Sequence, residues 1–188
     1  MARRRFGVAL LVPDPVAIEV DGLRRALGDG ALGRIPAHLT LVPPVNVAED
    51  DVTSALSVLR QAAMATGPID VRLGPAATFW PVTPVVYLQV GGDVVAVDEL
   101  RTRVFRSPLE REVTHPFVPH VTVADDLDAA RIPAAVEALA DFVVDVRVEA
   151  LHLLEEGRGR VWRPVAEMAF TRRWVGPPAG DGPGPTVD

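Results

Sequence analysis

One tetrapeptide pattern occurs twice in this 188-residue chain. His38-Leu39-Thr40-Leu41 and His120-Val121-Thr122-Val123 both read His-Φ-Thr-Φ, where Φ is an aliphatic residue. Successive side chains of a β-strand project to opposite faces of a sheet. Each motif therefore predicts a strand with an imidazole and a hydroxyl on one face and two core residues on the other. Burying polar side chains costs free energy unless they are hydrogen-bonded or bind a ligand. The fold therefore has to place both strands so that their polar faces have such partners.

The rest of the hydrophobic pattern alternates between strands and helices, with proline and glycine at the boundaries. The predicted strands are Phe6–Val12, Ile35–Val42, Ile69–Leu73, Val85–Val90, Val118–Ala124, Phe142–Leu154 and Val161–Phe170. The predicted helices are Pro15–Leu27, Asp51–Ala65, Asp93–Phe105 and Pro133–Ala140. The last two strands flank Gly157-Arg158-Gly159, which favours a hairpin.

The order of these elements contains a loose repeat. A strand, a helix, a strand with His-x-Thr and a second helix occur in that order twice, which predicts two similar lobes that share a cleft. The length suits one domain. We therefore expect a single bilobal domain over residues 1–175, followed by a Pro/Gly tail at 176–188 that is too polar and breaker-rich to fold.

Two missing residue types exclude several chemistries. The chain has no cysteine, and all 19 of its basic residues are arginine. Disulfides, thiolate nucleophiles and cysteine-ligated metals are excluded, as are a Schiff-base lysine, a Walker-A lysine and a lysyl-nucleotidyl intermediate. The net charge of −6 argues against a protein that coats long nucleic acid, but it leaves room for a small phosphorylated substrate.

The chain also lacks the pattern of a membrane or secreted protein. No run approaches the roughly 18 apolar residues that a membrane span needs. The apolar run Phe6–Val12 stops at Pro13-Asp14-Pro15 without a cleavage site for a signal peptidase. We expect a cytoplasmic protein with no membrane partner.

The two motifs and their contexts, IPAHLTLVPP and PFVPHVTV, resemble the 2H phosphoesterase superfamily, also called the LigT-like or 2′-5′ RNA ligase family. The shorter contexts are more similar to its small bacterial branch. The resemblance extends from Phe6 to Phe170, and LHLLEEGRGRVWRPVAEMAF is similar to the terminal hairpin of the family. It implies an α+β fold that is bilobal, with two similar antiparallel β-sheet lobes flanked by helices around a central cleft. It also implies a site without a metal ion. We further expect a monomer that needs no cofactor.

The activities that this resemblance implies are hydrolysis of 2′,3′-cyclic or related cyclic phosphates and, in some members, reversible 2′-5′ joining of RNA ends. The expected partner is therefore a small cyclic phosphate or an RNA terminus. In many ligase-type members a basic residue follows the second motif closely. Here Ala124-Asp125-Asp126 follows, which argues against binding of a long RNA.

The chemistry of the four motif side chains fits that reaction. Opening a cyclic phosphodiester needs a base to activate water and an acid to protonate the leaving ribose oxygen, and histidine can do either at neutral pH. Threonine hydroxyls can donate to the non-bridging oxygens as charge develops. We therefore predict His38 and His120 as catalytic residues and Thr40 and Thr122 as phosphate-binding residues. The resemblance implies that His38 is the acid and His120 the base.

Two alternatives stay open at this point. The chain could be a non-catalytic module that binds a nucleotide or an RNA end in the same cleft. It could also be a structural protein whose polar strand faces are merely hydrogen-bonded. The other polar and aromatic candidates have weaker patterns. We expect a surface-loop position for His115, a strand face for His152, the core for Phe79, Trp80 and Tyr87, and solvent for Arg34 and Arg163. We expect turn or solvent-facing positions for Asp125, Asp126, Glu155 and Glu156.

Overall fold

The computed structural model describes residues 2–171, so the tail predicted for 176–188 lies outside the described residues. The described strands are β1 (Arg3–Leu11), β2 (His38–Ala48), β3 (Ile69–Thr78), β4 (Val86–Gly92), β5 (His120–Ala124), β6 (Val144–Val148), β7 (Ala150–Glu156) and β8 (Trp162–Ala169). The α-helices are α1 (Val16–Leu27), α2 (Val52–Met64), α3 (Val94–Val104) and α4 (Ile132–Ala138), with short 3-10 turns at Glu49–Asp51, Ala129–Arg131 and Arg158–Arg160.

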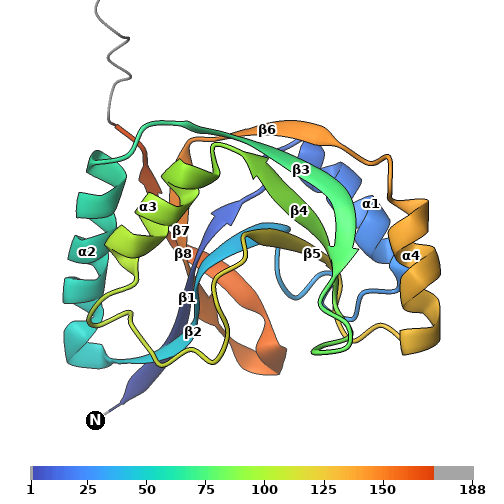
Figure 1. The fold of residues 1–188 in the computed structure, drawn as a ribbon. Helices are drawn as coiled ribbons and strands as arrows, with labels where there is room; N and C mark the ends of the chain where they lie inside the picture. Colours follow the sequence, from blue (N-terminus) through green and yellow to red (C-terminus); the bar gives the residue numbers. More distant parts are fainter. Residues whose placement is uncertain (1, 172–188) are drawn as a thin grey trace, which may run out of the picture.

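The strands form one curled antiparallel sheet in the order β6-β3-β4-β5-β2-β1-β7-β8 (Figure 1). It consists of two four-stranded halves, β6-β3-β4-β5 and β2-β1-β7-β8. The pair Leu39↔Val121 is the described ladder contact between them. The predicted α+β class with two antiparallel lobes is thus confirmed, and the lobes join edge to edge into a continuous sheet.

The predicted repeat is present in three dimensions. β1-α1-β2-α2 and β4-α3-β5-α4 follow the same order, and in each unit the first strand pairs with the strand that carries the His-x-Thr motif. The helices cross over between the halves: α1 packs on β5 and α3 packs on β2. Figure 1 shows α1 and α4 together at one side of the sheet and α2 and α3 together at the other. Each half is therefore covered by a helix from the other repeat.

One predicted strand is wrong. The segment Phe142–Leu154 forms two strands, β6 and β7, which lie in different halves of the sheet: β6 pairs with β3, and β7 pairs with β1. Glu149 separates them. The buried positions change phase there, from Val146 and Val148 to Leu151 and Leu153. This change of phase is the sequence signal of the crossing, because a continuous strand keeps one phase. The hairpin predicted next to it is confirmed as β7–β8.

The second strand also ends later than predicted. β2 continues through Pro43-Pro44 to Ala48, although proline removes a ladder donor. The register explains this: Phe6 lies opposite Val45 and Val8 lies opposite Val42, so both prolines face the single residue Gly7. An extra residue in one strand is a β-bulge, a position at which the ladder is already interrupted and proline is tolerated.

A buried ion pair holds the loop that leads into β2. Arg24, 3% exposed, donates from Nε to Oδ2 of Asp29 at 2.7 Å and from a terminal nitrogen to the carbonyl of Ile35 at 3.0 Å. The other oxygen of Asp29 accepts the backbone N–H of Ala31 at 3.1 Å and that of Asp125 at 3.2 Å. The pair thus ties the end of α1 to the approach to His38 and to the end of β5, across the two halves.

We predict that this pair stabilises the fold. Arg24→Ala leaves Asp29 buried without a counter-charge, which should cost about 3–5 kcal/mol in the free energy of unfolding measured in urea. Asp29→Ala should cost less, because Arg24 keeps a second carboxylate partner, Asp21, at 2.8 Å, and the double variant should cost less than the sum of the two. The control is Arg72→Ala, whose partner Asp145 lies in an exposed pair and whose loss should not change the midpoint measurably. An unchanged midpoint for Arg24→Ala would refute the prediction.

Candidate active site

The contact between the two halves puts the motif side chains on one face of the sheet. Leu39 and Val121 are opposite each other in antiparallel strands and point into the core, 3% and 1% exposed. Their neighbours point to the other face, so the register sets His38 across from Thr122 and Thr40 across from His120. All four are half-buried. The two histidines occupy diagonal positions, about 7–8 Å apart between backbones, which long side chains can span.

Each imidazole is held in the same way. Nδ1 of His38 lies 2.8 Å from the carbonyl oxygen of Pro36, and Nδ1 of His120 lies 2.7 Å from that of Val118. A carbonyl oxygen can only accept, so Nδ1 carries the hydrogen in both rings. This fixes both tautomers and leaves Nε2 as the nitrogen that gains or loses a proton. In both motifs the residue two before the histidine supplies the acceptor.

Burial favours the neutral form of both histidines. Desolvation lowers the pKa of His38, and the nearby positive charges of Arg24 and of His120 lower it further, against the hydrogen bond to Pro36. Desolvation also lowers the pKa of His120, against the hydrogen bond to Val118. At neutral pH the free protein therefore presents two uncharged Nε2 atoms to this face.

Aromatic rings surround His120. Its ring lies edge-on to Phe79, with centroids 5.0 Å apart, and to Tyr87, at 5.3 Å. Phe79 and Tyr87 stack on each other at 4.2 Å. Tyr87 is 8% exposed, so it is the core residue that we expected, and it also supports the imidazole. Trp80, next to Phe79 in the chain, is 49% exposed, so the core position expected for it is wrong.

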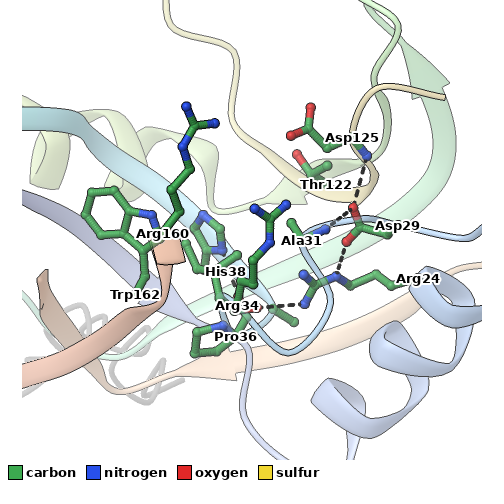
Figure 2. Close-up of a pocket in the computed structure, with 12 residues that line it drawn as sticks. Arg24, Asp29, Ala31, Arg34, Pro36, His38, Thr122, Asp125, Arg160 and Trp162 are labelled. Atoms are coloured by element: carbon green, nitrogen blue, oxygen red, sulfur yellow. Dashed lines mark hydrogen bonds and ion pairs between the residues drawn. The ribbon is translucent and has the colours of Figure 1, made fainter. Parts of the chain in front are cut away.

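A cavity of about 300 Å³ opens beside His38 and Thr122 (Figure 2). The loop before β2 supplies one wall, the end of β5 another and the start of β8 a third. The lining residues are Arg24, Asp29, Ala31, Arg34, Ile35, Pro36, Ala37, His38, Thr122, Asp125, Arg160 and Trp162. The site therefore has an aromatic end around His120 and an arginine-rich end around His38.

The other candidates take the following positions. His115 is exposed in the loop between α3 and β5. His152 lies on β7 in the cross-strand row Thr40–Ala9–His152–Glu167, and its Nε2 is 3.3 Å from Glu167. It is therefore a strand-face histidine, as expected, on the same face as the motif residues. Arg34 lines the cavity, whereas Arg163 lines a separate hollow.

The acidic pairs have mixed outcomes. Asp125 and Asp126 lie in a turn, as predicted, and Asp126 has a positive φ of 58°. Glu155 and Glu156 are not simply solvent-facing: they pair with Arg4 at 2.7 Å and with Arg5 at 2.9 Å across β1 and β7. These ion pairs form because β1 and β7 are adjacent in the sheet, and the sequence does not show which strands are adjacent.

Four charged or aromatic residues of the cavity were missed from the sequence: Arg24, Asp29, Arg160 and Trp162. Arg24 is on α1, and an arginine on a surface helix is ordinarily exposed to solvent. Asp29 lies between two glycines, a pattern typical of a turn. Arg160 and Trp162 come from the closing hairpin, and its contact with the loop before β2 is a tertiary feature. The glycines around Asp29 and Arg158 were the available signals, because they mark the two turns that form the walls.

The described part of the chain has neither a metal-binding cluster nor a membrane-spanning helix. Residues 2–171 contain no group of three His, Asp or Glu side chains that could hold a metal ion. No helix among these residues is long and apolar enough to cross a membrane.

Known proteins resemble the chain in sequence. It is 30% identical over 124 residues to a protein of Oceanobacillus iheyensis, covering 66% of this chain and 72% of the relative. It is 33% identical over 125 residues to one of Bacillus pumilus, covering 65% and 71%. It is 26% identical over 160 residues to one of Bacillus cytotoxicus, covering 84% and 92%. All three are named "putative phosphoesterase".

Solved structures share the fold. E. coli LigT complexed with 3′-AMP matches with a TM-score of 0.62 at 20% identity, over 91% of this chain and 100% of LigT. The protein TT0787 of Thermus thermophilus matches with a TM-score of 0.62 at 20% identity, over 88% and 97%. The family model of the 2′-5′ RNA ligase superfamily matches residues 12–160, a span that contains both motifs and most of the cavity wall. The chain therefore belongs to the 2′-5′ RNA ligase superfamily, the 2H phosphoesterases.

Proposed function

We propose that this protein is a phosphoesterase that opens cyclic phosphates, such as a 2′,3′-cyclic nucleotide or the cyclic phosphate at an RNA end, with His38 and His120 as its proton carriers. One observation carries the proposal: the pair Leu39↔Val121 aligns two His-Thr sets on one face, each with Nε2 left to exchange a proton. A lone histidine on a strand face has an ordinary structural explanation. Two histidines with the same tautomer, on strands that pair at Leu39 and Val121, provide an acid and a base for the same phosphorus.

The reaction needs one proton to be taken up and one to be delivered. Neutral Nε2 of one histidine removes a proton from water as its oxygen attacks phosphorus in line. The bond from phosphorus to the opposite ribose oxygen breaks, and protonated Nε2 of the other histidine delivers a proton to that oxygen. The hydroxyls of Thr40 and Thr122 donate to the non-bridging oxygens while negative charge develops on them. The product is a phosphomonoester with a free neighbouring hydroxyl.

The assignment of acid and base follows the family resemblance, with His38 as the acid and His120 as the base. The electrostatics add a condition, because Arg24 and His120 both lower the pKa of His38 in the free protein. An anionic phosphodiester bound beside the ring counteracts the positive charge of Arg24 and favours the imidazolium of His38 while His120 stays neutral. His38 would then take up its catalytic proton together with the substrate.

The relatives support the same class of reaction. The relatives from Oceanobacillus iheyensis and Bacillus pumilus, 30% and 33% identical, are named "putative phosphoesterase". The LigT structure of the same fold was determined with 3′-AMP, a nucleoside monophosphate. With a hydroxyl of a second RNA end in place of water as the nucleophile, the base would take the proton of that hydroxyl and the acid would protonate the released ribose oxygen. The same ring opening would then join the two ends, so 2′-5′ RNA ligation belongs to the same proposal. Assays of nucleoside 2′,3′-cyclic phosphates, an RNA 2′,3′-cyclic end, ADP-ribose cyclic phosphate and a 2′-5′ linkage test it. Binding without turnover of any of them would favour the non-catalytic module.

Substitution of the motif residues should separate their roles. His38→Ala and His120→Ala should each lower kcat by roughly 10²- to 10⁴-fold, the usual loss for general acid or base assistance. Thr40→Ala and Thr122→Ala should each cost roughly 10- to 100-fold, because one hydrogen-bond donor is lost. The double histidine variant should lose far less than the product of the single effects. Steady-state kinetics measure this, with the exposed His115→Ala as the control. Near wild-type turnover in either single histidine variant contradicts the mechanism.

The pH dependence should be bell-shaped, since one histidine must be neutral and the other protonated. The profile of kcat/KM reports the free enzyme, in which both pKa values are lowered, so its maximum should lie below pH 6.5. The profile of kcat reports the complex, in which the bound anion raises the pKa of the acid, so its alkaline limb should lie at higher pH. A rate that rises steadily to about pH 9 would exclude the mechanism.

The same reaction should not depend on a metal ion, because both proton transfers are assigned to histidine side chains. Turnover after incubation with EDTA should equal that of the untreated enzyme, and added Mg²⁺, Mn²⁺ or Zn²⁺ should not raise it. A loss of turnover in EDTA that Zn²⁺ or Mn²⁺ restores would overturn the metal-independent mechanism.

A further inference from the structure

Two arginines of the cavity have no carboxylate partner among the described residues. Over residues 2–171 no carboxylate lies within 4.0 Å of Arg34 or of Arg160. Arg34 donates from Nε to the carbonyl of Gly30 at 2.9 Å, which orients the guanidinium. Figure 2 shows the Arg34 guanidinium next to the His38 ring and the Arg160 side chain extending past the same ring, with its guanidinium farther out. Because the chain has no lysine, the choice of arginine at these positions is uninformative, and what matters is where the two charges lie.

The backbone brings the two arginines together from distant parts of the chain. The N–H of Trp162 donates to the carbonyl of Arg34 at 2.7 Å, which joins the start of β8 to the loop before β2. The turn before Trp162 is closed by a 2.8 Å bond from the N–H of Gly157 to the carbonyl of Val161. Within it Arg160 has a φ of 58°, an unfavourable value for a residue other than glycine. The fold thus accepts a local cost at the residue that faces the cavity.

The acidic groups of the cavity do not neutralise these arginines. Asp29 is saturated by Arg24 and by two backbone N–H groups. The carboxylate of Asp125 is exposed to solvent and lies in no ion pair among the described residues. With the Arg24–Asp29 pair balanced, the cavity therefore has two positive groups against one negative group, in a protein whose net charge is −6. Such a local excess attracts an anion.

We infer that this cavity is a subsite for a second phosphoryl group, so that the substrate is a nucleotide with both a cyclic phosphate and a further phosphate on its 5′ side. The inference rests on the proposed function, which places the reacting phosphorus between His38 and His120. A guanidinium presents paired N–H donors that match two phosphate oxygens, so Arg34 and Arg160 together can enclose one phosphoryl group. The indole of Trp162, which lies over β1 near Gly7, gives the ribose or base an apolar surface beside it.

This subsite names a substrate class among the cyclic phosphates. A nucleoside 2′,3′-cyclic phosphate with a free 5′-hydroxyl would leave both arginines without a partner. A 5′-phosphorylated nucleotide, a short oligonucleotide with a 5′-side phosphodiester and an ADP-ribose cyclic phosphate each carry the required second group. All three present the same phosphate chemistry to the cavity, and direct comparison separates them.

The test compares nucleoside 2′,3′-cyclic phosphates with and without a 5′-phosphate. Charge-assisted hydrogen bonds to the second phosphate should raise kcat/KM roughly 10- to 100-fold, mainly through KM. In Arg34→Ala and Arg160→Ala this ratio should fall toward one. Arg158→Ala is the matched control, because it removes the same charge from the same turn at a residue that lines a different hollow, and it should keep the ratio. A dinucleotide with a cyclic end and ADP-ribose cyclic phosphate, assayed in parallel, show which ester is preferred.

Two results would overturn the inference: equal kcat/KM for the two substrates in the wild-type protein, or a preference that survives in both arginine variants. Either would leave the proposed function intact as long as a cyclic phosphate is hydrolysed. If none is hydrolysed, the proposed function fails, and calorimetric titration decides about the subsite. Adenosine 3′,5′-bisphosphate should then bind at least about 10-fold more tightly than adenosine 3′-phosphate, and equal affinities would refute the subsite.

Discussion

The ladder contact between Leu39 and Val121 sets the geometry on which the rest of the site depends. The two halves of the sheet share one hydrophobic core, and neither half alone brings two histidines together. A shift of one residue in either strand would turn its histidine and threonine into the core and its aliphatic residues into the cleft. The aliphatic positions prevent this shift, because Leu39, Leu41, Val121 and Val123 are all buried in a common core. The hydrophobic half of each motif therefore fixes the position of the polar half.

Although the two motifs are duplicates, their surroundings differ. Aromatic rings hold His120, whereas arginines and the Arg24–Asp29 pair surround the approach to His38. For the proposed acid and base to take different roles in one reaction, the surroundings of the two histidines have to differ. The residues around the two motifs provide these different surroundings. The Arg24–Asp29 pair also contacts the second motif, because Asp29 accepts the backbone N–H of Asp125, so one hydrogen bond joins the two ends of the site.

The sequence predicted the elements that have a clear period and missed the tertiary contacts. The strands around His38 and His120 and the helices α1 to α3 begin close to the predicted bounds, because apolar alternation and breakers mark them. The error at Phe142–Leu154 arose because two strands of different halves follow each other with only a change of phase at Glu149. The cavity wall could not be predicted, since Arg160 and Trp162 reach the loop before β2 through one backbone bond between distant segments.

The strand order also has a consequence for how the chain folds as it is synthesised. The half with His120 takes β3, β4 and β5 from one contiguous stretch, while the half with His38 needs β1 to pair with β7, near the opposite end of the chain. Pairing over such a separation carries a large loop-closure cost and slows folding. A nascent chain that already contains both motifs can pair β1 with β2 but still lacks β7, the second neighbour of β1, and Arg160 and Trp162 leave the ribosome later still. Synthesis thus completes the wall beside His38 last, so a prematurely terminated product has both histidines but no finished cavity.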